Sequence, residues 1–128
     1  MARTRLTDDL PGCAMEASVA IIGGRWKGVI LFHLLDGVMR FNELHRQMPG
    51  ITPRLLTKQL RELEEDGLVA RMVYPVIPPK VEYSLTDEAI ELSPLLLSLN
   101  TWGRKWLATR GITPRNELPA VEAEPAVL

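Results

Sequence analysis

The chain has 128 residues, of which 46% are hydrophobic and 24% are charged, and its formal net charge is −1. These values are typical of one ordinary globular domain with a small core, and the near-neutral balance argues against binding to nucleic acid through overall charge. With Cys13 as its only cysteine, the chain forms no intrachain disulfide.

Residues 1–12 are polar and end at a Pro-Gly pair, so they are predicted to form a flexible arm. This stretch lacks the apolar run of a secretory signal. No later stretch has the unbroken apolar length that a membrane-spanning helix needs. The sequence therefore predicts a cytoplasmic protein without a membrane partner.

Three short helices are predicted ahead of the centre of the chain. The first covers residues 15–22 and stops at two glycines. The second covers residues 25–36, and its apolar side chains are too many for one narrow stripe, so it is expected to be central and heavily buried. The third covers residues 41–48 and ends at a Pro-Gly pair. Followed by another helix, it forms a helix-turn-helix.

The segment Ile51–Gly67 has the clearest helical pattern in the chain. Thr52 supplies a capping hydroxyl, and Pro53 fits the first helical turn. Gly67 tolerates the left-handed backbone that often follows a helix. One face carries an apolar stripe, formed by Leu56, Leu60 and Leu63. The opposite face is basic and hydroxyl-bearing, with Arg54, Thr57, Lys58 and Arg61.

The acids of this segment lie in its last turns, whereas a helix with a merely solvated face tends to carry acids first and bases last. They are Glu62, Glu64, Glu65 and Asp66. The basic side chains and the free N–H groups therefore share the other end of the helix. That end suits anions, and DNA phosphates and guanine edges are the obvious candidates. The alternative is a solvated helix face without a ligand.

Beyond this helix the periodicity changes to that of strands. Residues 68–74 are rich in β-branched and aromatic types, and residues 81–85 alternate apolar with polar. The proline-rich segment between them predicts a hairpin, which would be a wing. Thr86 is expected to cap a further helical region. Pro94 should begin a new helix there or kink that one.

Several segments agree in order and spacing with one family. They are IGGRWKGVIL, RFNEL, Gly50–Gly67, LVARMVY, IPPKVEYSLT and Trp102-Gly103. Over roughly Cys13 to Trp106, the chain resembles the HxlR-type family of bacterial transcription regulators. It departs from the family pattern at Ala14, where Pro is usual, and at Ala89, where Gly is usual.

The resemblance implies a mainly α fold with a small β-hairpin wing, that is, a winged helix-turn-helix domain with extra N- and C-terminal dimerisation helices. We expect the arm at residues 1–12, this domain at 13–110 and a disordered tail at 111–128, since the end of the chain is rich in Pro, Ala and Glu. The resemblance further implies a homodimer on a near-palindromic operator in double-stranded DNA, more often a repressor than an activator. Two recognition helices would lie about 34 Å apart, one turn of DNA.

Apolar side chains near both ends of the domain fit the implied dimer, because a wing alone would not cover them. The predicted interface residues are Met15, Val19, Ile22, Leu95, Leu96, Leu99, Trp102 and Trp106. Tryptophan mostly supplies buried area, so core and interface are the expected places for Trp26, Trp102 and Trp106. The alternative is a wall of these rings around an aromatic small-molecule effector.

The predicted DNA contacts come from the helix-turn-helix and the wing. Phosphate would meet Thr52, Pro53 and the N–H groups behind them. Arg54, Thr57, Lys58 and Arg61 would reach guanine edges or phosphate, without a sequence feature that says which does which. Arg40 would clamp phosphate ahead of the third helix. The wing would add Pro78, Pro79, Lys80 and Arg71.

Cys13 has two interpretations. A lone cysteine is most often a small buried hydrophobic residue. The HxlR-type resemblance instead aligns Cys13 with a cysteine that several members use to sense oxidants or electrophiles. Proximity to a helix start favours the reactive thiolate. An adduct or an intersubunit disulfide would then shift the spacing of the two DNA-binding heads.

Two rival functional classes remain beside a DNA-binding regulator. A winged-helix module for protein interaction predicts an apolar or acidic outward face on the recognition helix, whereas this face is basic. An enzyme would need a nucleophile–base pair or a phosphate-cradling loop, and neither is apparent. His33 and His45 are too few and too scattered for a metal site, and His45 is expected at the surface. We therefore predict no enzymatic activity, cofactor or metal.

Overall fold

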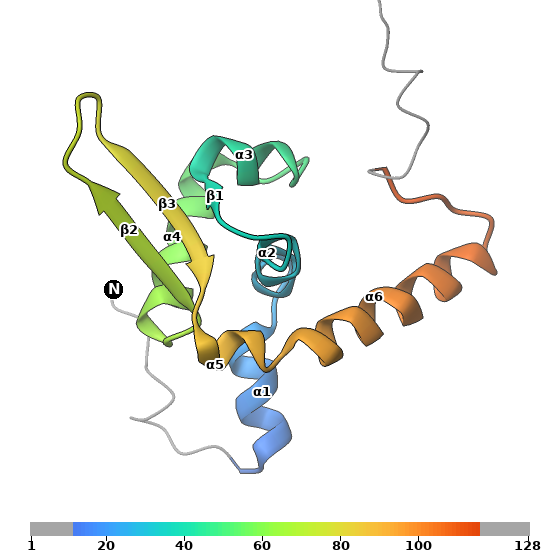
Figure 1. Ribbon diagram of the computed structural model, residues 1–128. Helices are drawn as coiled ribbons and strands as arrows, with labels where there is room; N and C mark the ends of the chain where they lie inside the picture. The colour runs from blue at the N-terminus through green and yellow to red at the C-terminus, as the bar shows by residue number, and fades with distance from the viewer. Residues whose placement is uncertain (1–11, 116–128) are drawn as a thin grey trace, which may run out of the picture. The chain divides into compact units, whose positions relative to one another are not determined.

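The computed structural model describes residues 12–115 (Figure 1). The helices and strands follow in the order α1 (Ala14–Ile22), α2 (Lys27–Leu34), β1 (Met39–Arg40), α3 (Phe41–Arg46), α4 (Pro53–Glu65), β2 (Val69–Tyr74), β3 (Lys80–Leu85), α5 (Asp87–Ile90) and α6 (Ser93–Ala108). Almost all of the predicted arm and most of the predicted tail lie outside the described residues. None of the helices within residues 12–115 has the length and apolarity needed to cross a membrane.

Within the described residues, the chain divides into two compact units, the first ending at Ser93 and the second beginning at Pro94. The first unit holds α1 to α5 and the sheet, and the second holds α6 apart from its first residue. The prediction that Pro94 begins a new helix is confirmed, because Pro94 lies in the first turn of α6. The Ser93 hydroxyl donates a hydrogen bond of 2.6 Å to the carbonyl oxygen of Ile90 and marks the junction between α5 and α6.

Helix α4 forms where the sequence predicted it and for the predicted reasons. The Thr52 hydroxyl accepts a hydrogen bond of 3.1 Å from the amide of Leu55, and Pro53 occupies the first helical position. After the helix, Gly67 has a φ of +82°, which residues with a side chain rarely adopt. These local features set both ends of α4.

The core of the first unit is built around the leucine stripe of α4. Leu56, Leu60 and Leu63 are at most 1% exposed, and α4 packs against both α2 and β2. The remaining large side chains that are fully buried are Ile30, Leu31, Leu44 and Met48. The expectation that the second helix is central is confirmed, since α2 contributes Ile30, Leu31 and Leu34 to this core.

One charged pair joins α2 to α4 inside the protein. Lys27 Nζ lies 2.7 Å from Glu62 Oε1, and the two side chains are only 9% and 13% exposed. Each charge loses hydration when it is buried, and the attraction between the two ions offsets part of that cost. The pair therefore helps to hold α4 at one angle on α2, a role that sequence reasoning missed for both residues.

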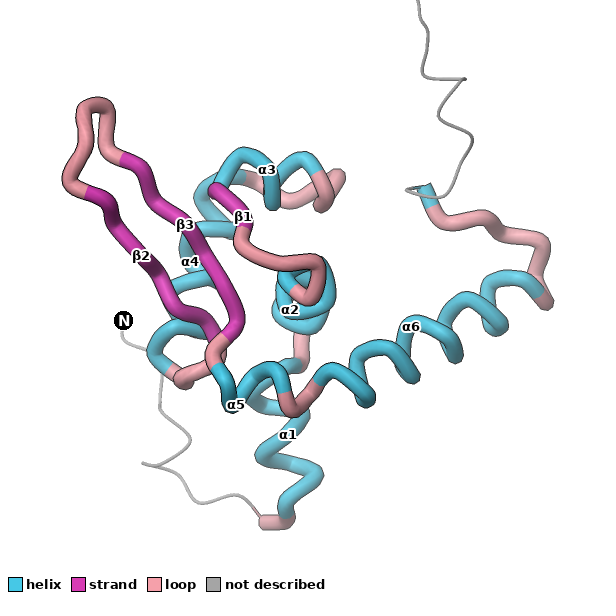
Figure 2. The backbone as a smooth tube through the Cα atoms, viewed as in Figure 1, coloured by secondary structure: helices cyan, strands magenta, loops and turns pink. Residues whose placement is uncertain are grey.

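The sheet has three antiparallel strands in the order β1-β3-β2, which Figure 2 shows in magenta. The wing, residues 69–85, consists of β2, β3 and their connecting loop, as predicted. The sequence analysis missed β1, which pairs Met39 with Tyr83 and Arg40 with Glu82. Two residues are too few to show a strand period, so only the pairing with β3 identifies β1 as a strand.

Thr86 links the end of the wing to α5 and to α4. Its hydroxyl accepts a hydrogen bond of 3.2 Å from the amide of Ala89, which confirms the predicted cap. The same hydroxyl donates a hydrogen bond of 2.7 Å to the carbonyl oxygen of Gly67. The turn after α4 and the start of α5 are thereby fixed to each other.

Candidate nucleic-acid interface

The outward face of α4 carries cations, opposite the buried leucine stripe. Arg54, Lys58 and Arg61, here called the basic face, are all exposed. Thr57 is half-buried, and its hydroxyl donates a hydrogen bond of 2.9 Å to the carbonyl oxygen of Pro53. Thr52 is exposed, and its hydroxyl caps the helix. The two hydroxyls thus bond to the backbone of the helix, whereas the cations of the basic face are exposed.

The turn between α3 and α4 sets the direction of the basic face. Gly50 takes a φ of +100° there, and Met48 and Ile51 are buried on either side of it. His45 Nε2 lies 2.9 Å from the carbonyl oxygen of Ile51, so this ring ties α3 to the residue just before the α4 cap. The side chain of His45 is partly exposed, so it lies at the surface while it makes this contact.

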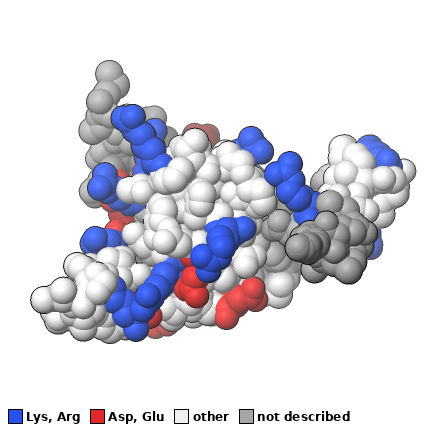
Figure 3. All heavy atoms as spheres, turned by 90° about the horizontal axis from the view of Figure 1, so that it is seen from above, with Lys and Arg blue, Asp and Glu red and all other residues white. Residues whose placement is uncertain are grey.

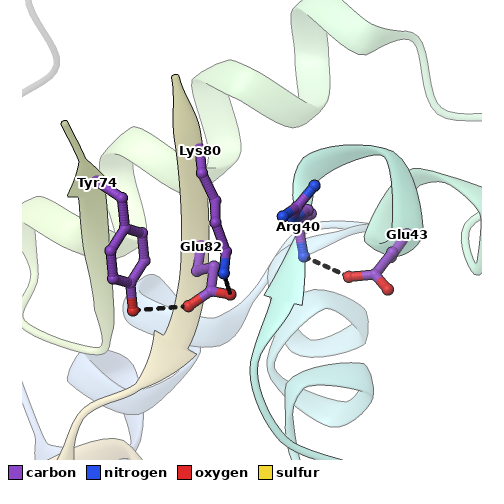
Figure 4. Close-up of polar contacts among 5 residues, drawn as sticks. All are labelled: Arg40, Glu43, Tyr74, Lys80 and Glu82. Atoms are coloured by element: carbon purple, nitrogen blue, oxygen red, sulfur yellow. Dashed lines mark hydrogen bonds and ion pairs between the residues drawn. The ribbon is translucent and has the colours of Figure 1, made fainter. Parts of the chain in front are cut away.

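Arg40 lies where β1 meets α3. The backbone amide of Arg40 donates a hydrogen bond of 2.7 Å to Glu43 Oε1, so the Glu43 side chain caps the start of α3. The side chain of Arg40 is exposed, and Figure 4 shows it where β1 runs into α3. The predicted phosphate-clamping guanidinium is therefore accessible.

The hairpin of the wing extends beyond the helices of the first unit (Figure 1). Pro78 and Pro79 are exposed in its loop, and Ile77 is 100% exposed. Lys80 is less free than the sequence suggested, because its ammonium lies 3.4 Å from Glu82 Oε2 and 4.9 Å from the centre of the Tyr74 ring.

Glu82 and Tyr74 form a hydrogen-bonded pair of titrating groups in the wing. The Tyr74 hydroxyl donates a hydrogen bond of 2.9 Å to Glu82 Oε1. This hydrogen bond is the largest cause of a lowered pKa of Glu82. Burial opposes it, and weaker contributions from Lys80 and Arg40 add to the lowering. The same bond and the Glu82 charge raise the pKa of Tyr74. Glu82 is therefore ionised and Tyr74 neutral at neutral pH.

A shallow groove of about 210 Å³ runs between α4 and the sheet. Arg61 comes to it from α4 and Arg71 from β2, so two guanidinium groups face one opening. The rest of its lining consists of Thr57, Leu60, Glu64 and Tyr83. Arg71 is exposed and shares its face of the sheet with Tyr83, its Cα partner on β3. The groove thus connects the basic face with the wing.

The net charge of −1 argues against DNA binding through overall charge, but the charges are unevenly distributed over the surface. Figure 3 shows that Lys and Arg outnumber Asp and Glu on the face that carries α3 and the tip of the wing. A local positive surface attracts a polyanion even when the total charge is near zero. The predicted cations thus lie on surface-exposed elements of the first unit.

The residues predicted for a dimer interface are mostly exposed in the single chain. On α1, Met15 and Val19 are exposed, whereas Ile22 is half-buried. On α6, the exposed members are Leu95, Leu99, Trp102 and Trp106. Leu96 differs from them, because only 4% of its surface is exposed. The exposed members form one apolar set on α1 and another on α6.

Cys13 is the residue immediately before α1, and its thiol is free and exposed. The interpretation of Cys13 as a small buried hydrophobic residue therefore does not fit the single chain. Its carbonyl oxygen accepts the first hydrogen bond of α1, at 3.3 Å from the amide of Ala17. Cys13 thus lies at a helix start, as the sensing hypothesis requires.

Neither histidine belongs to a candidate metal centre. His33 is half-buried in α2, and this burial lowers its pKa, with Asp36 offsetting part of the effect. Within residues 12–115, His, Cys, Asp and Glu form no cluster of three or more that could bind a metal ion. The exposed groups to which the sequence assigned a function are therefore cations, apolar side chains and one thiol.

Comparison with known proteins identifies the arrangement. Residues 21–110 match the family model described as HxlR-like helix-turn-helix. The chain belongs to this family. The HxlR-like proteins matched by this chain are transcriptional regulators with a DNA-binding winged helix, so this protein is a regulator of that kind and not an enzyme.

Two HxlR-like relatives illustrate the degree of similarity. The uncharacterized HTH-type transcriptional regulator YdeP of Bacillus subtilis (strain 168) is 53% identical over 100 residues, which cover 78% of this chain and 78% of YdeP. An uncharacterized HTH-type transcriptional regulator of Methanothermobacter thermautotrophicus is 48% identical over 99 residues, covering 77% of this chain and 76% of the relative.

Solved structures of HxlR-like regulators share the fold. The redox regulator HypR in its oxidized form is 52% identical and superposes with a TM-score of 0.70, over 73% of this chain and 96% of HypR. The diamide-treated YodB from B. subtilis is 33% identical, with a TM-score of 0.61 over 80% of this chain and 97% of YodB. Both proteins are similar to this chain over its winged helix-turn-helix.

Proposed function

We propose that this HxlR-like protein is a homodimeric repressor that binds a near-palindromic operator, with the basic face of α4 in the major groove and the wing along the backbone. The observation that carries the proposal is the arrangement of α4. Its leucine stripe is fully buried while Arg54, Lys58 and Arg61 project outward. A helix held in this way presents guanidinium and ammonium groups to base edges and phosphates.

A winged-helix module for protein interaction is the competing proposal. Such a module would present an apolar or acidic face to its partner, whereas three cations form the outward face of α4. Arg71 and Arg61 extend the positive surface into the groove beside the wing. The charge of this surface suits a polyanion better than an apolar protein partner.

The homodimer is supported by the two exposed apolar sets. Trp102 is 64% exposed and Met15 is 69% exposed in the single chain, and apolar patches rimmed by polar residues commonly mark protein interfaces. Two copies related by a twofold axis would place two α4 helices on successive half-sites of one operator. A regulator that binds such an operator is expected in the cytoplasm, and this location remains a prediction.

Binding to DNA at two salt concentrations tests this function. We expect the protein to bind the DNA upstream of its own gene more tightly than a random duplex of the same length. The logarithm of its affinity should fall with the logarithm of salt concentration at about 0.9 per phosphate contact. Sedimentation should give twice the chain mass of 14.4 kDa. Equal affinity for both duplexes would leave sequence-specific regulation without support.

We further propose that Cys13 makes the regulator responsive to oxidants or electrophiles. Its thiol is exposed at the start of α1, and HypR and YodB, two similar proteins, are described in an oxidized and a diamide-treated form, respectively. Because Cys13 is the only cysteine, a protein disulfide requires two copies of the chain. Such a link would change the spacing of the two α4 helices.

The variant Cys13→Ser is expected to abolish any effect of diamide or a quinone on DNA binding, because no other thiol remains. Reduced protein should bind DNA equally well with and without the substitution. Non-reducing electrophoresis of the wild type after diamide should show a band at twice the chain mass, and the variant should not. If the variant still responds to diamide, the sensing role of Cys13 is wrong.

A further inference from the structure

Glu82 is an acid in the middle of the cations predicted to meet DNA. It lies on β3, and its neighbours come from all three strands of the sheet: Arg40 on β1, Lys80 on β3 and Tyr74 on β2. Arg40 is its Cα partner. Figure 4 shows the Tyr74 hydroxyl and the Lys80 ammonium directed toward the Glu82 carboxylate, with Arg40 on the side away from Tyr74.

Both oxygens of the carboxylate are used. Oε1 accepts the Tyr74 hydroxyl at 2.9 Å, and Oε2 lies 3.4 Å from Lys80 Nζ. The Lys80 ammonium also lies 4.9 Å from the Tyr74 ring centre. These three contacts close a triangle, so the ends of Lys80 and Tyr74 are held in place by one carboxylate. The side chains of Lys80 and Glu82 are 36% and 22% exposed, so water still reaches the triangle.

Two opposite consequences follow from an acid in this position. As a bare negative charge, Glu82 would repel DNA phosphates and weaken binding. As a partner of Lys80, it would limit the many rotamers of a long lysine and let the neighbouring cations approach one another. A side chain ordered before binding loses less entropy when it binds.

We propose that Glu82 is a positioning residue for DNA, one that holds the Lys80 ammonium and the Tyr74 hydroxyl in place, on the strand paired with Arg40, so that the wing meets the phosphate backbone in a single arrangement. The proposal rests on the DNA-binding function proposed above. The register of the sheet supports it, because Arg40 and Glu82 are partners and Tyr74 and Lys80 are partners two residues farther along. Side chains two residues apart on a strand share a face.

The raised pKa of Tyr74 and the lowered pKa of Glu82 are consistent with this contact. The largest cause of both shifts is the hydrogen bond between these two side chains. The contact can thus be followed through the pKa of Tyr74, without DNA. Tyr74 and Tyr83 are the only tyrosines, so tyrosinate absorbance reports few groups.

The variant Glu82→Gln separates the two consequences, because they differ in sign. A positioning role predicts that this variant binds a random duplex of about 30 base pairs more weakly, by roughly two- to tenfold at low salt. Simple repulsion predicts tighter binding, and tighter binding would overturn the proposal. Glu91→Gln on the first unit is a matched control, since it removes an equal charge from an exposed acid outside the cluster. It should bind no more weakly than wild type.

A double-mutant cycle shows whether Glu82 acts through Lys80. In a Lys80→Met background, Glu82→Gln should lose most of its effect on affinity, because the group that it positions is gone. An undiminished effect in that background would overturn the proposed role. Thermal unfolding of each variant checks that the fold is retained, as expected for substitutions of partly exposed side chains.

Titration of the tyrosines tests the contact without DNA. In Glu82→Gln, tyrosinate should form at lower pH than in the wild type, and Tyr74→Phe should remove the affected tyrosine. An unchanged titration would overturn the positioning contact itself. If wild-type protein fails to bind any duplex while the titration shifts as expected, the proposed DNA function fails and the contact stands without that role.

Discussion

Replacing Lys27 by methionine is expected to lower the free energy of unfolding by about 3–5 kcal/mol, the usual effect of removing one partner of a buried ion pair. Glu62, whose side chain is only 13% exposed, would then lose the ammonium that lies 2.7 Å from its carboxylate. A small domain is stable by only about 5–15 kcal/mol. The variant should therefore be close to unfolding, as denaturant melts would measure.

Two controls separate the broken pair from the loss of any lysine. Lys58→Met removes an exposed lysine from α4, and surface substitutions usually change stability by no more than about 0.5 kcal/mol. Lys27→Met combined with Glu62→Leu removes both charges and should recover part of the loss, because an apolar pair has no hydration to replace. A loss no larger in Lys27→Met than in Lys58→Met would show that the pair does not stabilise the fold.

The position of α4 should also depend on this pair. Lys27 comes from α2 and Glu62 from α4, and the carboxylate lies one helical turn from Lys58. Loss of the pair removes a constraint on the angle of α4, so the basic face should become less well ordered. DNA binding by Lys27→Met, measured below its melting temperature, is therefore expected to weaken although Lys27 is buried.

Replacing Arg54 by alanine is expected to weaken DNA binding by about 1–3 kcal/mol if Arg54 reads a base, which is roughly 5- to 150-fold in affinity. Arg54 lies in the first turn of α4, with its side chain exposed and adjacent to the capped helix N-terminus. That end of a recognition helix is the part that contacts base edges in helix-turn-helix proteins. Titration of wild type and variant against the preferred duplex measures the loss.

Comparing the loss of affinity of Arg54→Ala on the preferred duplex and on a random duplex shows whether Arg54 contacts a base or a phosphate. If it reads a base, the loss should be confined to the preferred duplex. If it binds phosphate, affinity should fall equally on a random duplex and the salt slope should decrease by about 1. Arg110→Ala is a matched control, because its exposed guanidinium stacks on Trp106 outside the helix-turn-helix, at 3.7 Å from the ring centre. Arg54→Ala binding as tightly as Arg110→Ala to every duplex would place the DNA contact elsewhere.

Local patterns in the sequence were sufficient to predict α4 and the wing. The Thr52 cap, the leucine stripe and Gly67 each depend on neighbours within a few residues, and each lies as predicted. The predicted dimer residues and Cys13 remain predictions of assembly and reactivity. Their exposure is a property of the single chain, whereas dimerisation requires a second copy and the reaction of Cys13 requires an oxidant.

Contacts between distant residues were the part that the sequence did not reveal. The short strand β1 exists because Met39 and Arg40 pair with β3. His45 is tied to Ile51 by the turn that returns α4 beside α3. The alternation of residues 81–85 predicted a strand but did not identify Tyr74 and Lys80 as the partners of Glu82. In each case a partner comes from another element.

The resemblance of whole segments to the HxlR-type family indicated the class of regulator. By itself, the sequence also determined the helices, the two strands of the wing, and which face of α4 is apolar and which is basic. These properties follow from side-chain periodicity and capping, which act along a few neighbouring residues. Tertiary structure alone decided that a buried Lys27–Glu62 pair anchors α4 and that Glu82 restrains a predicted DNA-binding lysine. Hydrogen bonds and ion pairs depend on distance in space, and only the packed chain brings these groups within 4 Å of each other.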